Sequence, residues 1–432
     1  MNFEETLDWL YGFQKFGMKL GLERITHITD NLGSPHKNYK IIHVGGTNGK
    51  GSVCKFLESI LVRNGYTVGV YTSPHLQHIS ERIVVNKKRI TEEELVSLVK
   101  KIKPVVEEMM ENENNPTFFE SFTAIAFEYF KEKNVDFAII EVGLGGRFDA
   151  TNIVDPVVSV ITNISPEHQN VLGKKIEDIA FEKAGIIKDH VPIVTATKGD
   201  ALRVIGKIAE EKNAPVKKIS DSNWKRLRDD DLNQEFSING FLSSYSVRTA
   251  LIGGYQGENI ALAISTVEFL QNNRFNISEE SIVDGIKNTV NPGRMEVVSY
   301  DPCILLDGAH NIAGMKILAE TLENDFQFDK LILILGILSD KDIEEMLPII
   351  VPFAEIIITT KSSNNRAFDP TELKNMIDKL GDTKTIVVKD QIIDAIDYAK
   401  SIAKKSDLIC ITGSLFTVGE ARDYLVSNLQ KC

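Results

Sequence analysis

The 432-residue chain has little cysteine, little tryptophan and no long apolar run. Its four cysteines lie far apart without C-x-x-C spacing, which argues against a disulfide framework and is typical of reduced thiols in a cytoplasmic protein. No apolar run is long enough to cross a membrane, and the N-terminus lacks a signal-peptide pattern. The net charge of -12 argues against a general nucleic-acid binder. We therefore expect a cytoplasmic protein with no membrane and no nucleic-acid partner.

Strand-like apolar runs alternate with amphipathic helical patterns along most of the chain. This alternation predicts an α/β fold in which helices cover mostly parallel sheets. The polar stretch 214–250 breaks the rhythm, and short antiparallel strands and loops are expected there. A second alternating series begins after N-P-G-R at 291–294, which is typical of an interdomain turn. We predict a large P-loop ATPase-like domain over 1–295 and a smaller, Rossmann-like α/β domain over 296–432.

A glycine-rich turn, V-G-G-T-N-G-K-G-S at 44–52, joins a strand-like run to a helical pattern. Its glycines let backbone N–H groups approach anionic oxygens, and a helix N-terminus favours negative charge. Lys50 supplies a positive charge, and Ser52 is placed to meet a phosphate oxygen or its magnesium. The turn departs from the common P-loop, because Val44 replaces the first glycine and Gly51 separates Lys50 from Ser52. A glycine turn without a ligand is the alternative to a phosphate-binding loop.

Other polar residues follow predicted strands, and the carboxyl ends of parallel strands line the ligand crevice of such sheets. Glu141 ends a buried-strand pattern and is a candidate magnesium ligand, with a paired or helix-capping Glu as the alternative. Ser73 and His168 also follow strands, where a turn residue and a structural histidine are the alternatives to ligands. Lys183 lies on a helical pattern, where lysines usually extend to water. Asp307 suits a ribose or phosphate contact, or an Asp-capped turn.

Taken together, these residues resemble the folylpolyglutamate synthase/dihydrofolate synthase family, within the Mur-ligase superfamily of ATP-dependent amide ligases. The resemblance covers nearly the whole chain. Its motifs are G-T-N-G-K-G-S at 46–52, S-P-H-L at 73–76, E-V-G-L-G-G-R at 141–147, D-A-T-N at 149–152, E-K-A-G-I at 182–186, G-R at 293–294 and D-G-A-H-N at 307–311. The chain departs from the family pattern at three positions. Glu167 stands where Asp is common, Tyr255 replaces a histidine, and Ile312 replaces a proline.

The resemblance implies a role for each candidate and adds several others. It implies an ATP site formed by Thr47, Asn48, Gly49, Lys50, Gly51, Ser52, Asn259, Arg294 and Asp307. It implies two magnesium sites formed by Ser73, Glu141, His168 and a carbamylated Lys183. It implies contacts with a pterin substrate from Thr117, Phe148, Asp149 and Ala150. The expected catalytic residues are Lys50, His168 and Lys183.

The expected activity is the ATP-dependent addition of L-glutamate to a folate-type carboxylate, either dihydropteroate or tetrahydrofolate or both. A carboxylate does not acylate an amine at neutral pH without activation, so an acyl phosphate intermediate is expected. The cofactors are then ATP and Mg²⁺ at two sites, the partners are small molecules, and a monomer is expected. One alternative is a related ligase acting on another acid. The other is a nucleotide-driven switch, which would hydrolyse nucleotide without an acid substrate.

Overall fold

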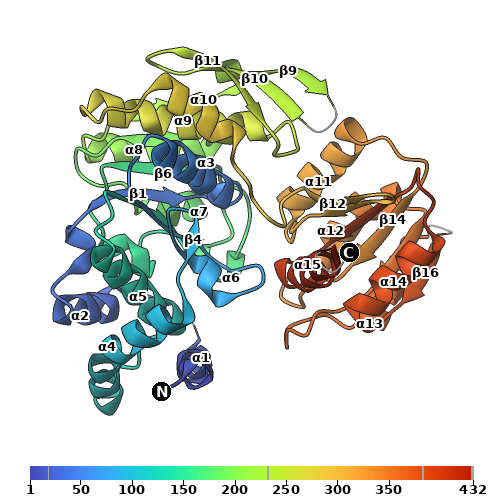
Figure 1. The fold of residues 1–432 in the computed structure, drawn as a ribbon, viewed down its shortest axis with the longest axis horizontal. Helices are drawn as coiled ribbons and strands as arrows, with labels where there is room; N and C mark the ends of the chain where they lie inside the picture. The colour runs from blue at the N-terminus through green and yellow to red at the C-terminus, as the bar shows by residue number, and fades with distance from the viewer. Residues whose placement is uncertain (18, 231–232, 382–383, 430–432) are drawn as a thin grey trace. The chain divides into compact units, whose positions relative to one another are not determined.

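The computed structural model describes residues 1–17, 19–230, 233–381 and 384–429 (Figure 1). The chain forms two compact units. The first comprises Met1–Arg228, Glu235–Thr249 and Gly257–Thr289, and the second comprises Asp229–Gln234, Ala250–Gln256 and Val290–Cys432. The second unit thus takes in two short segments that precede residue 257, which the sequence did not predict. The functional division into 1–295 and 296–432 stays a prediction.

The first unit is built on an eight-stranded sheet with the order β4-β3-β2-β5-β1-β6-β7-β8. Parallel pairing runs from β2 through β8, and only the pairs β2–β3 and β3–β4 are antiparallel. The mostly parallel α/β sheet predicted from the sequence is therefore confirmed. The strands are β1 (Lys40–Gly45), β2 (Val68–Tyr71), β3 (Ile83–Val85), β4 (Lys88–Arg89), β5 (Phe137–Glu141), β6 (Val158–Ile161), β7 (Ile193–Thr195) and β8 (Val216–Lys218).

The polar stretch 214–250 differs in part from its prediction. Its first strand, β8, is a parallel edge strand of the large sheet, because it pairs with β7 in parallel register. The remaining strands form a separate three-stranded sheet in the order β11-β10-β9. They are β9 (Trp224–Asp230), β10 (Asn233–Asn239) and β11 (Ser244–Thr249).

Helices cover both faces of the large sheet. In Figure 1, α3, α9 and α10 lie on one side of it, and α2, α4 and α5 lie on the other. Thr91 is the N-cap of helix α4, and its hydroxyl accepts from Glu94 N as the capping-box spacing predicted. Helices α3 and α10 approach closely, since a Cβ on Gly285 would lie 2.6 Å from Ile60 Cα. The helices are α1 (Phe3–Tyr11), α2 (Glu23–Asn31), α3 (Lys50–Arg63), α4 (Glu92–Glu111), α5 (Phe118–Glu132), α6 (Gln169–Leu172), α7 (Ile176–Ala184), α8 (Gly199–Glu211), α9 (Gln256–Asn272) and α10 (Glu279–Lys287).

The second unit is a six-stranded sheet with the order β12-β13-β17-β14-β15-β16. Only the edge pair β12–β13 is antiparallel, and strand β14 is buried along its whole length, as expected of a parallel strand covered by helices on both faces. Its strands are β12 (Glu296–Tyr300), β13 (Cys303–Leu306), β14 (Leu331–Leu335), β15 (Ile356–Thr359), β16 (Thr385–Val388) and β17 (Leu408–Thr412). Its helices are α11 (Ile312–Asp325), α12 (Ile343–Ile350), α13 (Pro370–Asp378), α14 (Ile392–Ile402) and α15 (Leu415–Leu429).

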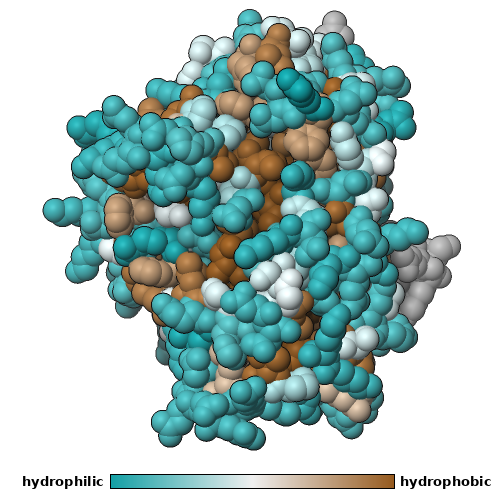
Figure 2. Space-filling model, turned by 90° about the vertical axis from the view of Figure 1, so that its left-hand side faces the viewer, coloured by the Kyte–Doolittle hydropathy of each residue, from teal (hydrophilic) through white to brown (hydrophobic). Residues whose placement is uncertain are grey.

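Among the described residues, no helix combines the length and the apolar composition that a bilayer crossing requires. Figure 2 shows one face of the molecule as largely hydrophilic, with hydrophobic side chains coming into view in hollows between polar ones. Interrupted apolar patches of this kind are ordinary on globular proteins.

Candidate active site

The predicted phosphate loop lies between β1 and α3 and is held by the segment that follows β6. The amides of Thr47 and Asn48 donate to the carbonyl and side-chain oxygens of Asn163, at 2.8 and 3.0 Å. From the other side, the Thr162 hydroxyl donates to Asn48 O at 2.6 Å. The loop is therefore fixed to the neighbouring strand end before any ligand arrives, which reduces the entropy lost on binding.

Two geometric features of the loop require glycine and bring in a distant residue. Gly49 has a φ of 85° and precedes the first residue of α3, so it supplies the left-handed turn into the helix. A Cβ at this position would lie 2.5 Å from Asn259 Oδ1 on α9. The structure thus brings Asn259, expected at the ATP site, to the loop from more than 200 positions away in the chain.

Lys50 occupies the first turn of α3 with its amine directed at the loop. Its Nζ donates to Gly46 O at 3.0 Å and to Thr47 O at 2.9 Å. Ser52 is buried in the same turn. A lysine charge among loop carbonyls and a helix N-terminus is the arrangement that binds the oxygens of a polyphosphate.

Glu141 and Ser73 lie together at the carboxyl ends of the adjacent strands β5 and β2. The Ser73 amide donates to Glu141 Oε2 at 3.2 Å, and the Glu141 side chain is buried. Carboxylate and hydroxyl oxygens are ligands that Mg²⁺ prefers. This pair is the part of the predicted metal set that the fold brings together.

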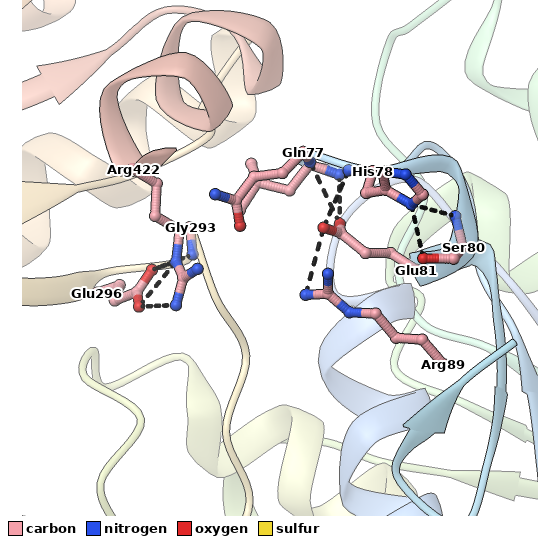
Figure 3. Close-up of polar contacts among 9 residues, drawn as sticks. Gln77, His78, Ser80, Glu81, Arg89, Gly293, Glu296 and Arg422 are labelled. Carbon is pink, nitrogen blue, oxygen red and sulfur yellow. Dashed lines mark hydrogen bonds and ion pairs between the residues drawn. The ribbon is translucent and has the colours of Figure 1, made fainter. Parts of the chain in front are cut away.

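The loop that follows Ser73 is clamped by one carboxylate, as Figure 3 shows. Glu81 accepts from the amides of Leu76 at 2.8 Å, Gln77 at 3.3 Å and His78 at 3.1 Å. Arg89 on β4 completes the cluster with a 3.4 Å ion pair to Glu81. Three backbone donors on one carboxylate fix the path of this loop, a role of Glu81 that no sequence motif had indicated.

Lys183 lies on α7 and is buried, contrary to the expectation that a lysine there extends to water. Its Nζ donates to Glu167 Oε1 at 2.6 Å and to Gly46 O at 2.9 Å. Burial lowers the pKa of Lys183, although Glu167 opposes the shift. Burial alone would raise the pKa of Glu167, but the charges of Lys183 and Lys50 lower it overall. In the sequence, Glu167 stood out only as a departure from the family pattern, and its contact with Lys183 was not predicted.

His168 follows β6, as expected, and precedes the short helix α6 with a φ of 48°. Its side chain is exposed, whereas Glu141 and Lys183 are buried. Within the described ranges, no three side chains among His, Cys, Asp and Glu form a group that could hold a metal ion. The predicted role of His168 at a second metal site stays a prediction.

The four residues expected to contact a pterin lie at the start of α5 and after the glycine-rich turn that follows β5. Thr117 caps α5, because its hydroxyl accepts from Glu120 N at 3.2 Å. Phe148 is 37% exposed and lies under the Arg147 guanidinium, whose carbon is 4.3 Å from the ring centre. Ala150 is buried in the turn that follows. Phe148 therefore presents the accessible apolar surface of this set.

Asp149, the fourth of these residues, is buried and accepts several internal hydrogen bonds. Its oxygens accept from Leu144 N at 2.8 Å and from the Thr151 hydroxyl at 2.5 Å. The Thr151 oxygen in turn contacts His43 Nε2 at 2.8 Å, and since that hydroxyl donates to Asp149, the histidine nitrogen is assigned as the donor. Burial lowers the pKa of His43 to about 3, so the ring is neutral at pH 7.

In the second unit, Asp307 directly follows β13 and orders the turn that carries Arg294. Its carboxylate accepts from Met295 N at 3.0 Å and from Ala309 N at 2.9 Å. Arg294 Nη1 donates to Gly308 O at 3.2 Å. Burial raises the pKa of Asp307, and the nearby Arg294 opposes that shift. The fold thus brings together two residues that were expected to serve one nucleotide.

Asp307 does not cap α11, which was the alternative considered from the sequence. The N-cap is Asn311, whose side chain accepts from Gly314 N at 2.7 Å. The turn that carries Arg294 is fixed to α15 by an ion pair. In this pair, Arg422 Nε and Nη2 both lie 2.9 Å from the carboxylate of Glu296 (Figure 3). Glu296 also accepts from Gly293 N at 2.7 Å.

Two family models match the chain. The Mur ligase middle domain matches residues 44–267, and the Mur ligase glutamate ligase domain matches residues 293–415. The first match includes the phosphate loop, Glu141, Lys183 and Asn259, and the second includes Arg294 and Asp307.

Full-length relatives are also similar. The dihydrofolate synthase/folylpolyglutamate synthase of Bacillus subtilis is 40% identical over 98% of this chain and 99% of its own. The structure of Mycobacterium tuberculosis folylpolyglutamate synthase complexed with ADP superposes with a TM-score of 0.91 at 31% identity, covering 98% of this chain and 99% of that one. A structure of E. coli FolC in complex with DHPP and ADP gives a TM-score of 0.88 at 29% identity, covering 100% and 99%.

Proposed function

Because this chain belongs to the dihydrofolate synthase/folylpolyglutamate synthase family of Mur-type ligases, we propose that it adds L-glutamate to a folate-type carboxylate in an ATP-dependent reaction. The observation that carries the proposal is the loop 46–52. It is held against Asn163 and lies beside Asn259, in a chain similar to such enzymes over its full length.

The loop would bind the phosphates of ATP through its amides, with Lys50 opposite the transferring phosphoryl group. Phosphorylation of the substrate carboxylate gives an acyl phosphate, which the amine of glutamate attacks with release of phosphate. The protein contributes charge and position rather than a covalent nucleophile. Asn259 would contact the nucleotide from α9, while Arg294 and Asp307 are assigned to it on the family pattern.

The residues at the ends of β2 and β5 fit a magnesium ion. The hydroxyl of Ser73 and the buried carboxylate of Glu141 would supply hard oxygen ligands, and the 3.2 Å hydrogen bond from the Ser73 backbone amide holds the Glu141 carboxylate beside Ser73. A magnesium ion there would offset the negative charge of the phosphates. A second magnesium ion would be coordinated by Glu141, His168 and a carbamylated Lys183.

We further propose that Lys183 is carbamylated in the active enzyme. An ammonium next to a dication is electrostatically unfavourable, whereas a carbamate is an anionic oxygen ligand. Burial lowers the pKa of Lys183, which favours the neutral amine that reacts with CO₂. Glu167 holds the same amine at 2.6 Å, so carbamylation requires this ion pair to open. The released Glu167 would then lie beside the modified side chain.

The proposed function is tested by phosphate release from ATP with dihydropteroate and with tetrahydrofolate, each with and without L-glutamate. We expect release that depends on both the acid and the amino acid. Activity with one acid or with both would define the substrate, and gel filtration would test the expected monomer. Release that needs neither partner would favour a nucleotide-driven switch instead. Glutamate-dependent release with a different acid only would place the chain among related ligases.

A further inference from the structure

Arg82 is a half-buried cation near the proposed magnesium ligands, and it has no anionic partner in the part of the chain that the structure describes. It ends a short 3-10 helix, Ile79–Arg82, which leads into β3. Within the described residues, no carboxylate lies within ion-pair distance of its guanidinium. Burial lowers the pKa of Arg82, although nearby acidic groups, including Glu141, oppose that shift. A cation kept partly out of water without a carboxylate is costly unless something else compensates it.

The orientation of this guanidinium is fixed by its neighbours. Arg82 Nε donates to His75 Nδ1 at 2.9 Å, and burial lowers the pKa of His75 to about 3, so the histidine is a neutral acceptor. The guanidinium carbon lies 5.3 Å from the ring centre of Phe118 and 5.9 Å from that of Phe122. With Nε engaged, the pair of terminal nitrogens is the part left to bind an anion. Two parallel N–H donors match the two oxygens of a carboxylate.

The surroundings of Arg82 are those of an aromatic acid site. Tyr11 stacks on Phe118 at 5.7 Å, and Phe118 stacks on Phe122 at 5.5 Å, so three rings form a continuous wall beside the cation. Phe118 directly follows Thr117, one of the residues expected to contact the pterin. Burial raises the pKa of Tyr71. The charges of Arg82, Asp149 and Glu141 all influence this pKa as well. Arg82 therefore lies among the groups assigned to the substrate and to the metal.

We propose that the terminal nitrogens of Arg82 bind a substrate carboxylate, with the Phe118 and Phe122 rings beside it. This inference rests on the proposed function, because it assumes that the chain binds a folate-type acid and L-glutamate. The carboxylate belongs either to the acid that is activated or to the incoming amino acid. His75 is then a positioning residue, since it holds the guanidinium through Nε. None of the sequence motifs pointed to this role for Arg82.

The test measures binding of dihydropteroate and of its carboxamide analogue to the full-length protein with Mg²⁺ and ADP, by calorimetry. In the wild type, the acid should bind roughly 10- to 100-fold more tightly than the amide, as expected for a charge-assisted hydrogen bond. Arg82→Met should bind both equally, at the affinity of the amide, and Arg82→Lys should fall between. ADP affinity and Tm should stay close to those of the wild type, which separates lost binding from misfolding. Arg63→Met, at an exposed position on α3, is the matched control.

The second arm measures the KM for L-glutamate in the ligation assay. A rise of 10-fold or more in Arg82→Met, with the preference for acid over amide unchanged, would assign the guanidinium to the carboxylate of the amino acid. If the preference for acid over amide and the KM for L-glutamate in Arg82→Met are both those of the wild type, Arg82 binds no substrate carboxylate and the inference is wrong. Failure of the proposed function is distinguishable, because it would appear as a wild type without glutamate-dependent phosphate release.

Discussion

Lys183 and Glu167 form a buried ion pair, with Lys183 Nζ 2.6 Å from Glu167 Oε1 and side chains that are 3% and 12% exposed. The same amine donates to Gly46 O at the start of the phosphate loop. Helix α7, the segment after β6 and the phosphate loop therefore meet at one nitrogen atom. Removal of either charge would leave the other buried without its partner, which is more costly than the loss of an exposed pair. The proposed carbamylation of Lys183 must therefore start from an amine that is paired with Glu167.

Lys183→Ala should be nearly inactive, because it removes the amine that is expected to become a metal ligand. Acetate should restore part of the activity by supplying a carboxylate at the vacant position. In the wild type equilibrated with ¹³C-bicarbonate, NMR should show a carbamate carbon that is missing in Lys183→Ala. Lys174→Ala, at an exposed position just before α7, should retain both activity and signal. An active, magnesium-loaded enzyme with an unmodified Lys183 in its electron density would refute the carbamate.

Lys50→Ala should reduce kcat by about 10²- to 10³-fold or more, because the loop loses the charge that stabilises the transferring phosphoryl group. Stability in urea should change little, since the hydrogen bonds of Lys50 Nζ in the described part of the chain go to two loop carbonyls. Lys207→Ala on α8 is the control, as its side chain is 77% exposed. A near-normal kcat in Lys50→Ala would mean that the loop does not bind the reacting phosphates.

Gly49→Ala should destabilise the protein and weaken ATP binding. The left-handed backbone alone costs about 1–2 kcal/mol for a residue with a Cβ, and the contact with Asn259 adds to this. The matched change is Gly206→Ala on α8, where no atom lies within 4 Å of the added Cβ. That variant should be stabilised by about 0.5–1 kcal/mol. Urea unfolding and ATP titration of the two variants measure both effects, and equal behaviour would contradict the local geometry.

His43 should make the protein less stable as the pH falls. Burial lowers its folded pKa to about 3 from the ordinary value of 6.5, so between these values the unfolded chain binds a proton that the folded chain does not. The free energy of unfolding should therefore fall by about 2 kcal/mol from pH 7 to pH 5 through this residue alone. His36 and His75 act in the same direction, because burial lowers the pKa of each.

The contribution of His43 is isolated by comparing urea unfolding of the wild type and His43→Gln at several pH values. The variant should show a shallower pH dependence over this window, by about the amount given above. His27→Gln, at an exposed position on α2, should keep the wild-type profile. Parallel profiles for the wild type and His43→Gln would show that His43 is not the neutral, buried group described here.

Much of the fold was predictable because its signals are local. The apolar runs that became β1, β5 and β14 are short and bounded by turn residues, and the helices between them carry their own caps, as Thr91 does for α4. Strand β8 was assigned wrongly, because its sequence is polar and only pairing with β7 makes it part of the large sheet. The pattern of apolar and polar residues within a segment does not show which strand that segment will pair with.

The sequence by itself determined the α/β class and the family, and it predicted the phosphate loop, since glycine spacing and strand–helix alternation are properties of neighbouring residues. The tertiary structure alone decided which side chains meet. Among the described residues, it placed Asn259 beside Gly49, paired Lys183 with Glu167 and left Arg82 against aromatic rings without a carboxylate. The physical reason is that burial and ion pairing depend on atoms that are distant along the chain. These distant contacts, and not the residues next to Lys183 in the sequence, decide whether its side chain extends to water or is buried.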